Sequence, residues 1–411
     1  MKTLYVIYHG QLVGELHQTD TGHLSFNYTG AWLSSDNAHA ISHSLPLRSE
    51  AFEERECIGF FGGLLPEETN REVIAKNLGI TSKNDFAMLK EIGGECAGAI
   101  SLIEAEQDNT PQESNYQRIS EEELEAIILK LPKAPLLAGT RGIRLSLAGA
   151  QNKLALFKDE QGFALPLNES PSSHILKPDS HHFPKLVENE AYCLWLSAQC
   201  GLPTAAAEVL DVGSQRSLLL TRYDRTGVGE PLTRRHQEDF CQALGVPSRT
   251  KYQAEGGPSF ADCFALIRKA STQPARDLIT LFEASIFNYL IGNNDAHGKN
   301  FSFLYSPIDG RPSIRLAPIY DLVCTAYLED LSPKMAMKIG KAYLPSDIRL
   351  KHWETFWETI GFSKRQAHKQ SLEFADRVAS ALKPTPESEV EAKIQEIIND
   401  RIAAIKSALK N

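Results

Sequence analysis

The stretch Ile291–Asp321, IGNNDAHGKNFSFLYSPIDGRPSIRLAPIYD, decides the fold of this chain and the chemistry expected of it. Within it, Asp295 and Asn300 stand in a D-x-x-x-x-N pattern. The mostly apolar run Phe301–Tyr305 follows, and Asp309-Gly310 is a strong turn dipeptide before the chain returns to Asp321. The stretch therefore predicts a loop and a hairpin that bring two carboxylates and one amide together.

The D-x-x-x-x-N spacing is that of the catalytic loop of protein kinases. Phosphoryl transfer needs one carboxylate to receive the proton of the attacking hydroxyl, and an amide and a second carboxylate to hold Mg²⁺. Asp295, Asn300 and Asp321 are the candidates for these roles. An Asn-Asn-Asp sequence after a helix also fits a plain C-terminal turn, because Asn and Asp tolerate left-handed backbone angles. The stretch alone leaves both interpretations open.

Composition sets the broad class of the protein. The 411 residues leave room for two or three domains, and 42% hydrophobic with 23% charged residues is ordinary for a soluble globular protein. We find neither an apolar run long enough to cross a bilayer nor a signal-peptide core. Seven scattered cysteines without a C-x-x-C pair argue against disulfides and a zinc site, so we expect a cytoplasmic protein. The net charge of −9 predicts that any DNA contact comes mainly through a partner.

The first hundred residues predict a small α+β module. A β-hairpin is expected in residues 1–17 and a third strand at 22–28, followed by helices near 67–78 and 85–92. We place this module at residues 1–105 and expect a docking or lid role for it. Residues 106–117 are polar and turn-rich, so they form the predicted linker. Ser120 and the three glutamates after it then predict a capped helix that runs to about Leu131.

The segment Ile143–Phe157, IRLSLAGAQNKLALF, predicts a strand, a glycine-containing turn and a second strand. Such a turn can lay backbone N–H groups over phosphates, and Gln151 and Lys153 could add side-chain contacts. A plain hairpin turn fits the same pattern.

Further along, Ser173–Lys177 is a short predicted strand that ends in a lysine, and Leu186–Cys200 is a predicted helix that carries Glu190. A strand lysine followed by a helix glutamate matches the ion pair that holds a phosphate ligand in kinases, although both could be solvated surface charges. The apolar run before Thr221 leads into a polar segment, as in an adenine-binding hinge. Amphipathic helices are predicted at 277–291 and 387–410.

Together these segments resemble the HipA family of bacterial toxin serine/threonine kinases, from HipBA-type toxin–antitoxin systems. The resemblance covers nearly the whole chain. It is carried by SLAGAQNK (146–153), HILK (174–177), ENEAYC (188–193), RYDR (222–225), QEDFCQ (237–242), KYQAEGGP (251–258), DAHGKN (295–300) and PIYDL (318–322).

The resemblance implies an α+β, bilobal, protein-kinase-like fold with an added N-terminal α+β module. Residues 118–225 would form the kinase N-lobe, with a mixed sheet, the phosphate loop and the hinge. Residues 226–411 would form a mostly helical C-lobe with the catalytic loop and the metal-binding aspartate.

The resemblance also implies roles for individual residues. Asp295 would be the catalytic carboxylate, Asn300 and Asp321 would bind Mg²⁺, and Glu190 would form the structural ion pair. Ser146 would be the autophosphorylated serine whose modification ejects the phosphate loop and switches the kinase off; its dianionic phosphate would compete with those of ATP. The residues expected to contact ATP are Ala148, Gly149, Ala150, Gln151, Asn152, Lys153, Lys177, Thr221, Arg222, Tyr223, Asp224, His297, Gly298, Lys299, Asn300, Tyr320, Asp321, Leu322 and Val323.

The family implies partners as well. A HipB-like helix-turn-helix antitoxin would neutralise the toxin and bind operator DNA, and an aminoacyl-tRNA synthetase, glutamyl-tRNA synthetase in particular, would be the substrate. Inhibition of translation would lead to growth arrest and persistence. No membrane partner is expected.

Two other functions remain open on the sequence. The chain could be a small-molecule kinase on the same fold, since a fold does not fix a substrate, or a non-catalytic ATP-binding regulator of transcription. The class of nucleophilic hydrolases is excluded because the sequence contains no G-x-S-x-G elbow. His181-His182 lacks ligand spacing for a metal hydrolase, so we expect these to be loop residues.

Overall fold

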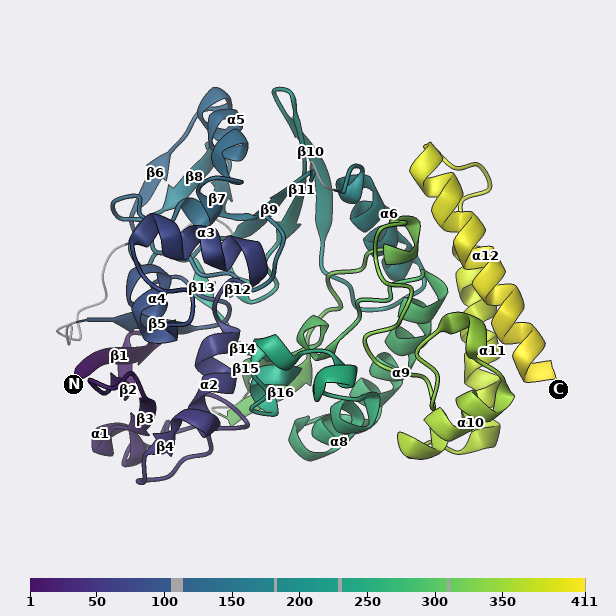
Figure 1. The fold of residues 1–411 in the computed structure, drawn as a ribbon, viewed down its shortest axis with the longest axis horizontal. Helices are drawn as coiled ribbons and strands as arrows, with labels where there is room; N and C mark the ends of the chain where they lie inside the picture. The colour runs from purple at the N-terminus through teal and green to yellow at the C-terminus, as the bar shows by residue number, and fades with distance from the viewer. Residues whose placement is uncertain (105–113, 181–182, 228–230, 309–310, 411) are drawn as a thin grey trace. The chain divides into compact units, whose positions relative to one another are not determined.

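The computed structural model describes residues 1–104, 114–180, 183–227, 231–308 and 311–410. Most of the predicted linker, the His181-His182 pair and the predicted Asp309-Gly310 turn lie outside the described residues. The chain forms two compact units (Figure 1). The first unit contains Met1–Pro178, Leu210–Arg249 and Leu304–Ser313, and the second contains Asp179–Val209, Thr250–Phe303 and Ile314–Asn411.

The first unit begins with a five-stranded sheet in the order β4-β3-β2-β1-β5. The predicted hairpin is confirmed, with Tyr8 opposite Gln11 at its turn, and the predicted third strand pairs antiparallel with the second. Leu4, Val6 and Phe26 are fully buried, so alternate positions of the strands face the core. The strands are β1 Lys2–Tyr8, β2 Gln11–Gln18, β3 Leu24–Tyr28, β4 Phe52–Glu53 and β5 Ile100–Ile103.

Helices of the first unit follow and interrupt these strands. The two predicted helices are confirmed as α3 and α4, whereas α2 was not predicted. A Cβ on Gly59 of α2 would lie 2.4 Å from the backbone of Gly245, so only glycine allows this close approach. The helices are α1 Gly30–Leu33, α2 Glu54–Gly63, α3 Glu68–Leu78, α4 Asp85–Ile92, α5 Glu121–Lys130 and α7 Phe240–Ala243. At α5, Ser120 and Glu123 form the predicted capping box.

A second sheet, most of which belongs to the first unit, has the order β10-β11-β9-β7-β8-β6. Its described registers, which join β11 to β9, β9 to β7, β7 to β8 and β8 to β6, are antiparallel, whereas a mixed sheet was expected. The strands are β6 Tyr116–Arg118, β7 Leu154–Asp159, β8 Gly162–Pro166, β9 His174–Pro178, β10 Ala207–Val212 and β11 Gln215–Thr221.

The prediction of a strand before the glycine turn is wrong. Residues 143–147 form no strand and do not pair with β7; the segment instead makes isolated parallel bridges, from Leu145 to Glu95 and from Gly149 to Pro66. Partners distant in the sequence thus replace the hairpin partner that the local pattern predicted.

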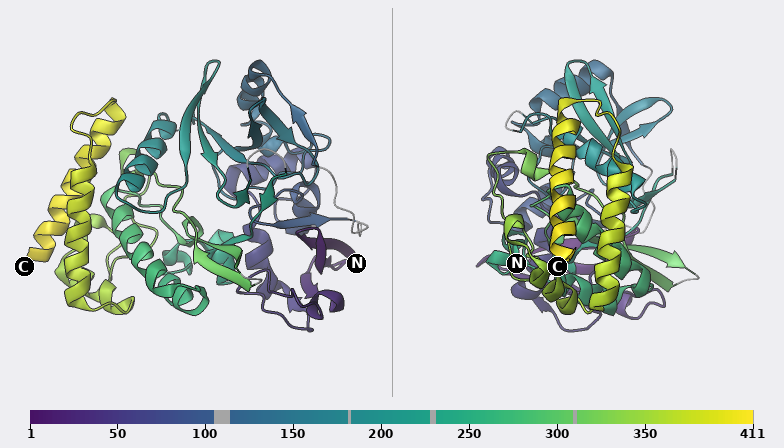
Figure 2. Two further views of the ribbon diagram at one scale, coloured as in Figure 1. Left: turned by 180° about the vertical axis from the view of Figure 1, so that it is seen from behind. Right: turned by 90° about the vertical axis from the view of Figure 1, so that its right-hand side faces the viewer.

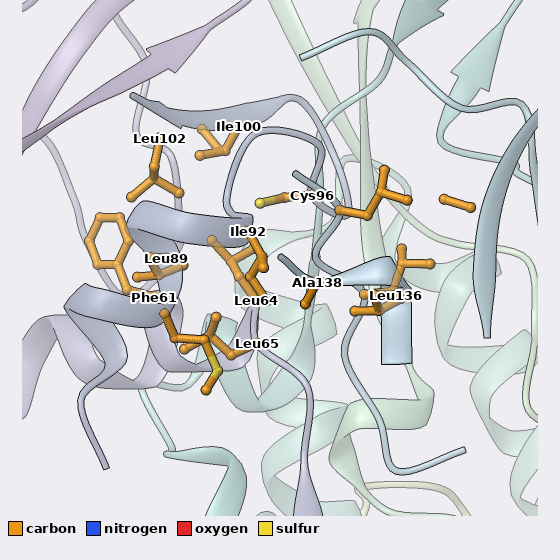
Figure 3. Close-up of a cluster of buried hydrophobic side chains, with 14 of the residues drawn as sticks. Phe61, Leu64, Leu65, Leu89, Ile92, Cys96, Ile100, Leu102, Leu136 and Ala138 are labelled. Atoms are coloured by element: carbon orange, nitrogen blue, oxygen red, sulfur yellow. The ribbon is translucent and has the colours of Figure 1, made fainter. Parts of the chain in front are cut away.

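One hydrophobic core runs through the first unit. Figure 3 shows side chains from the end of α2, from α4 and from β5 gathered together, with Leu136 and Ala138 beside them. The same core includes Leu156 of β7, Leu176 of β9 and Leu219 of β11, all at most 1% exposed. Buried side chains of the N-terminal module and of the second sheet therefore pack together in one core.

The second unit is mainly helical. Pro274 opens α9, whose buried residues include Leu281, Phe282 and Phe287. Phe282 stacks on Phe362 with ring centroids 4.8 Å apart. Figure 2 shows α11 and α12 side by side in both views. The helices are α6 Leu186–Gln199, α8 Phe260–Ala270, α9 Pro274–Leu290, α10 Leu350–Thr359, α11 Lys364–Ala381 and α12 Glu389–Lys410.

Short strands complete the fold. They are β12 Arg225–Thr226 and β13 Thr233–Arg234, which pair with each other, and β14 Gln237–Asp239, β15 Ser302–Ile308 and β16 Arg311–Leu316, which form a three-stranded sheet. Among the described residues, no helix is long and apolar enough to cross a membrane. The predicted boundaries at 105, 117 and 225 stay predictions.

A buried network of ion pairs lies inside the first unit. Glu95 accepts two hydrogen bonds from Arg225 at 2.8 and 2.9 Å, and Asp224 accepts from Arg222 at 2.7 Å and from Arg225 at 2.8 Å. Arg234 adds a contact to Glu95 at 3.3 Å. Burial alone would raise the pKa of Glu95, but the arginines lower it from 4.5 to about 2. The charge on Glu95 therefore stabilises the fold above pH 4.5 and stops doing so as the pH falls toward 2.

Replacing Glu95 with Gln should lower the free energy of unfolding by about 3–5 kcal/mol, because buried arginines would lose their partner. Urea unfolding followed by circular dichroism measures this loss. The control is Glu104→Gln, which removes an exposed partner of Lys90 and should cost at most about 1 kcal/mol. Equal losses in the two variants would contradict the importance assigned to the network.

Glu238 of β14 is a second buried carboxyl in the first unit. It accepts hydrogen bonds from Ser42 Oγ at 2.5 Å, from His43 N at 3.0 Å and from the Tyr305 hydroxyl. Burial raises its pKa from 4.5 to about 7. Between these two pH values the folded state holds a proton that the unfolded state has lost, so this group lowers stability as the pH rises.

The variant Glu238→Gln should therefore gain stability relative to the wild type as the pH rises from about 5 to about 8, by about 2 kcal/mol. Urea unfolding of both proteins at several pH values measures the difference, in which the titration of other groups largely cancels. A difference that does not change with pH would show that Glu238 is ionised in the fold at pH 5.

Candidate active site

In the second unit, the predicted catalytic loop follows α9 directly. Asp295 is exposed, although its neighbours Asn294 and Ala296 are buried. The Tyr252 hydroxyl donates a hydrogen bond of 2.9 Å to Asp295 Oδ1. The ring of Tyr252 also lies edge-on to His297, with centroids 5.6 Å apart. One carboxylate is thus presented to solvent from a loop that is otherwise packed.

Asn293 connects this loop to the segment around Asp321. Its Nδ2 donates to the Asp321 carbonyl at 3.2 Å and to Asn288 Oδ1 at 2.8 Å, and its Oδ1 accepts from the Asp295 amide at 3.2 Å. A single buried amide side chain therefore fixes the backbone both at the predicted catalytic carboxylate, Asp295, and at the predicted metal ligand, Asp321.

Asn300 ends the short 3₁₀ turn Gly298–Asn300. Its Oδ1 accepts a hydrogen bond of 3.0 Å from the His297 amide, which fixes the side chain. Tyr320 lies close by in the fold, since its hydroxyl donates to the Lys299 carbonyl at 2.7 Å. The structure thus brings the DAHGKN and PIYDL segments together.

Asp321 is held in an unusual backbone conformation, with φ at 51°. The residues after it are tied to α6, because Asn189 Oδ1 accepts from the Cys324 amide at 2.7 Å and its Nδ2 donates to the Cys324 carbonyl at 3.0 Å. Leu322 is buried and Val323 is half-buried. The backbone around Asp321 is therefore fixed, and its metal-binding role stays a prediction.

The predicted metal ligands fit Mg²⁺ by their chemistry. Asn300 and Asp321 offer an amide oxygen and a carboxylate, the hard donors that Mg²⁺ prefers, and this ion is usually held by one or two protein ligands together with water and phosphate oxygens. Among the described residues, no group of three or more His, Cys, Asp or Glu side chains could hold a metal ion. A metal held entirely by such side chains is thus not seen there.

In the first unit, the predicted phosphate loop lies against the N-terminal module. Ser146 is fully buried, and its hydroxyl donates to the Leu64 carbonyl at 2.8 Å. Lys153 Nζ donates to the Ala148 carbonyl at 2.5 Å, across the loop. Gly149 has φ at 102°, which favours glycine at this turn. The loop closes on itself, and the serine predicted to be phosphorylated is inaccessible in this conformation.

The predicted ion-pair residues are both buried. Lys177 lies on β9, opposite Leu218 of β11, and is 5% exposed. Glu190 lies on α6 and is 1% exposed. Burial argues against the alternative that both are solvated surface charges. Lys177 belongs to the first unit and Glu190 to the second, so their pairing stays a prediction.

The residues of the predicted hinge differ in how far they are exposed to solvent. Thr221 is exposed at the end of β11 and Tyr223 is half-buried, so both are accessible. Arg222 and Asp224 are 5% and 3% exposed and belong to the buried ion network. Their side chains have a structural role there, and a contact between Asp224 and ribose stays an untested prediction.

Three residues of the site were not predicted. Tyr252 lies in the quoted segment KYQAEGGP, Asn293 precedes the D-x-x-x-x-N pattern, and Asn189 lies in ENEAYC. Each contacts at least one residue that is distant in the sequence, so no local pattern reveals its role. The signal available was that each stands in or beside a segment that carries the resemblance.

Comparisons with known proteins agree with this architecture. The family described as HipA N-terminal domain matches residues 4–103, and the HipA-like C-terminal domain matches residues 145–382. The protein Y4mE of Sinorhizobium fredii is 43% identical over 93% of this chain and 91% of its own. The serine/threonine-protein kinase toxin HipA of Shewanella oneidensis is 30% identical over 90% of this chain and 86% of its own.

The solved structure of HipA from Shewanella oneidensis MR-1, in complex with HipB and its operator DNA, is similar along the whole length. It matches with a TM-score of 0.83 and 28% identity, and the match covers 99% of this chain and 97% of that one. The predicted α+β, kinase-like fold is therefore confirmed. The two family domains, the extent of the matches and the arrangement of the catalytic loop lead to one conclusion: this chain belongs to the HipA family.

Proposed function

We propose that this member of the HipA kinase family is an ATP-dependent serine/threonine protein kinase and the toxin of a type II toxin–antitoxin system. The observation that carries the proposal is the loop that presents Asp295 to solvent while Asn293 fixes it to the backbone of Asp321. A plain C-terminal turn, the alternative for this stretch, would not need a second acidic segment fixed by the same side chain.

In the proposed reaction, a serine or threonine hydroxyl of the substrate attacks the γ-phosphorus of ATP. A bond from that oxygen to phosphorus forms, the bond to the β-phosphate oxygen breaks, and ADP leaves. The hydroxyl proton passes to the Asp295 carboxylate, which Tyr252 orients through its hydrogen bond. Exposure of Asp295 supports this role, because the acceptor must reach it.

The remaining predicted residues would bind the nucleotide. Lys177 would contact the phosphates, the backbone of Ala148–Lys153 would cover them, and the backbone of Thr221–Tyr223 would contact adenine. Asn300 and Asp321 would hold Mg²⁺, which supplies neutralisation of the charge on the phosphates. Lys177 lies on β9 at 5% exposure, where water screens its charge only weakly, and this supports the phosphate contact.

The relatives support a proposal for the biological role. The Shewanella protein carries the name of a kinase toxin, and its solved complex contains HipB and operator DNA. For this chain we therefore propose a cytoplasmic toxin that a HipB-like antitoxin neutralises, with operator DNA bound mainly through that antitoxin. An aminoacyl-tRNA synthetase of the glutamyl type is the proposed substrate, and its phosphorylation would inhibit translation and promote persistence.

Incubation with Mg-ATP, followed by intact-protein mass spectrometry, tests the chemistry. Wild type should gain one phosphoryl group, and Ser146→Ala and Asp295→Ala should gain none. A protein whose starting mass already carries the phosphate is first treated with a phosphatase. If Asp295→Ala keeps the full rate of phosphoryl transfer, the proposed catalytic role is wrong. Phosphate that appears on a metabolite, and not on protein, would favour the small-molecule kinase.

Tyr252→Phe should lower kcat about tenfold and leave the KM for ATP within about twofold. The reason is that a hydrogen bond to a charged group, here the catalytic carboxylate, is lost while the nucleotide contacts stay. Steady-state kinetics on a protein substrate measures both constants. Tyr192→Phe on α6 is the control and should keep the wild-type kcat. A rise in KM without a fall in kcat would contradict the orienting role of Tyr252.

A further inference from the structure

Backbone groups of the phosphate loop are hydrogen-bonded to the N-terminal module. Asn70 Nδ2 donates to the Ala150 carbonyl at 2.8 Å, and the Glu67 amide donates to the Gly149 carbonyl at 3.3 Å. Just before the loop, the Ser146 hydroxyl donates to the Leu64 carbonyl at 2.8 Å. All of these residues belong to the first unit. The contacts run along the loop in order, so they fix the path of its backbone.

The side of the contact that belongs to the module is anchored in the hydrophobic core. Leu64 and Leu65 are at most 2% exposed, and Figure 3 shows their side chains among those of Leu89 and Ile92. Helix α3 begins immediately afterwards at Glu68. Since the core holds the backbone at residues 64–67, the loop receives hydrogen bonds from a support that does not need to be ordered first.

Among these contacts, the hydrogen bond from Asn70 is made by a side chain of α3. Asn70 lies in the first turn of α3, is half-buried, and reaches a carbonyl 80 positions further along the chain. The contacts from Glu67 and Gly149 are made by backbone groups, which a substitution cannot delete. Asn70 is therefore the residue through which the support of the loop can be tested.

We propose that Asn70 is a positioning residue for the nucleotide site: its side-chain amide holds the phosphate loop in the conformation that receives the phosphates of ATP. The proposal rests on the proposed function, and it assigns the N-terminal module a part in nucleotide binding. By this inference, the module supports the loop directly, beyond the docking or lid role expected from the sequence.

The chain supplies a matched control on the same helix. Asn77, two turns further along α3, donates from its own Nδ2 to the Lys133 carbonyl at 2.9 Å. This bond has the same chemistry and nearly the same length, but it ends outside the phosphate loop. Asn77→Ala therefore reproduces the loss of a side-chain amide from α3 without changing the support of the loop.

The experiment compares Asn70→Ala, Asn77→Ala and wild type by two measurements on the full chain. Isothermal titration calorimetry with Mg-ATP gives the dissociation constant, and hydrogen exchange without nucleotide gives the opening of residues 147–152. Loss of one hydrogen bond should weaken ATP binding and speed up exchange in the loop by about two- to tenfold in Asn70→Ala. Asn77→Ala should match wild type in both measurements.

A conservative variant separates positioning from loss of structure. Asn70→Gln keeps the amide donor and should restore most of the ATP affinity. The urea midpoint of Asn70→Ala should equal that of Asn77→Ala, so a loss of ATP affinity cannot be attributed to a loss of overall stability. Wild-type ATP affinity and wild-type loop exchange in Asn70→Ala would overturn the proposal. If wild type itself binds no ATP, the proposed function fails, whereas the exchange measurement still decides whether Asn70 holds the loop.

Discussion

The first unit depends on the buried ion pairs around Glu95. Two carboxylates and two arginines are buried there and lose their hydration, and the partly buried Arg234 adds a third cation. The arrangement is stable because each carboxylate accepts several hydrogen bonds, including 2.7 Å from Ser172 to Glu95 and 2.8 Å from the Gly98 amide to Asp224. Because these partners come from separate parts of the chain, the network holds the N-terminal module and the RYDR segment in one arrangement.

In the second unit, the polar groups of the catalytic loop are held in place directly after an apolar helix. Helix α9 supplies buried aromatic side chains along its length, and the loop begins where it ends. Amide side chains then replace water as partners of the turning backbone, Asn293 at Asp295 and Asn189 at Cys324. Such fixed hydrogen bonds keep a carboxylate oriented before substrate arrives, which is the kind of preorganisation that catalysis requires.

The segment around the phosphate loop is held both by the ion network and by residues that are anchored in the hydrophobic core. Residues just before the loop pair with Glu95, which belongs to the ion network, and Ser146 and Gly149 contact the residues after α2 that are anchored in the core. Burial of the Ser146 hydroxyl also gives a physical reason why a phosphate on this serine would be incompatible with the present conformation. A dianion cannot be placed in a fully buried site beside a carbonyl oxygen without displacing the loop.

Much of this protein was readable from the sequence alone. Local signals sufficed where a structure depends on neighbouring residues: the first hairpin, the capping box at Ser120 and the helices α3, α4, α6 and α9. The motifs also sufficed for the family, since they are specific when taken together. Periodicity and capping are properties of short segments, so the sequence contains them in full.

Only the tertiary structure decided the partners of polar groups. Residues 143–147 were expected to pair with the next strand, but they pair with Glu95 and leave the loop resting on the N-terminal module. Asp224 was expected near ribose, and it lies in a network of buried arginines. Tyr252 and Asn293 had no assigned role until their contacts were seen. The physical reason is common to all of these: a buried donor or charge must find a partner, and which one it finds depends on distant segments that the fold brings together.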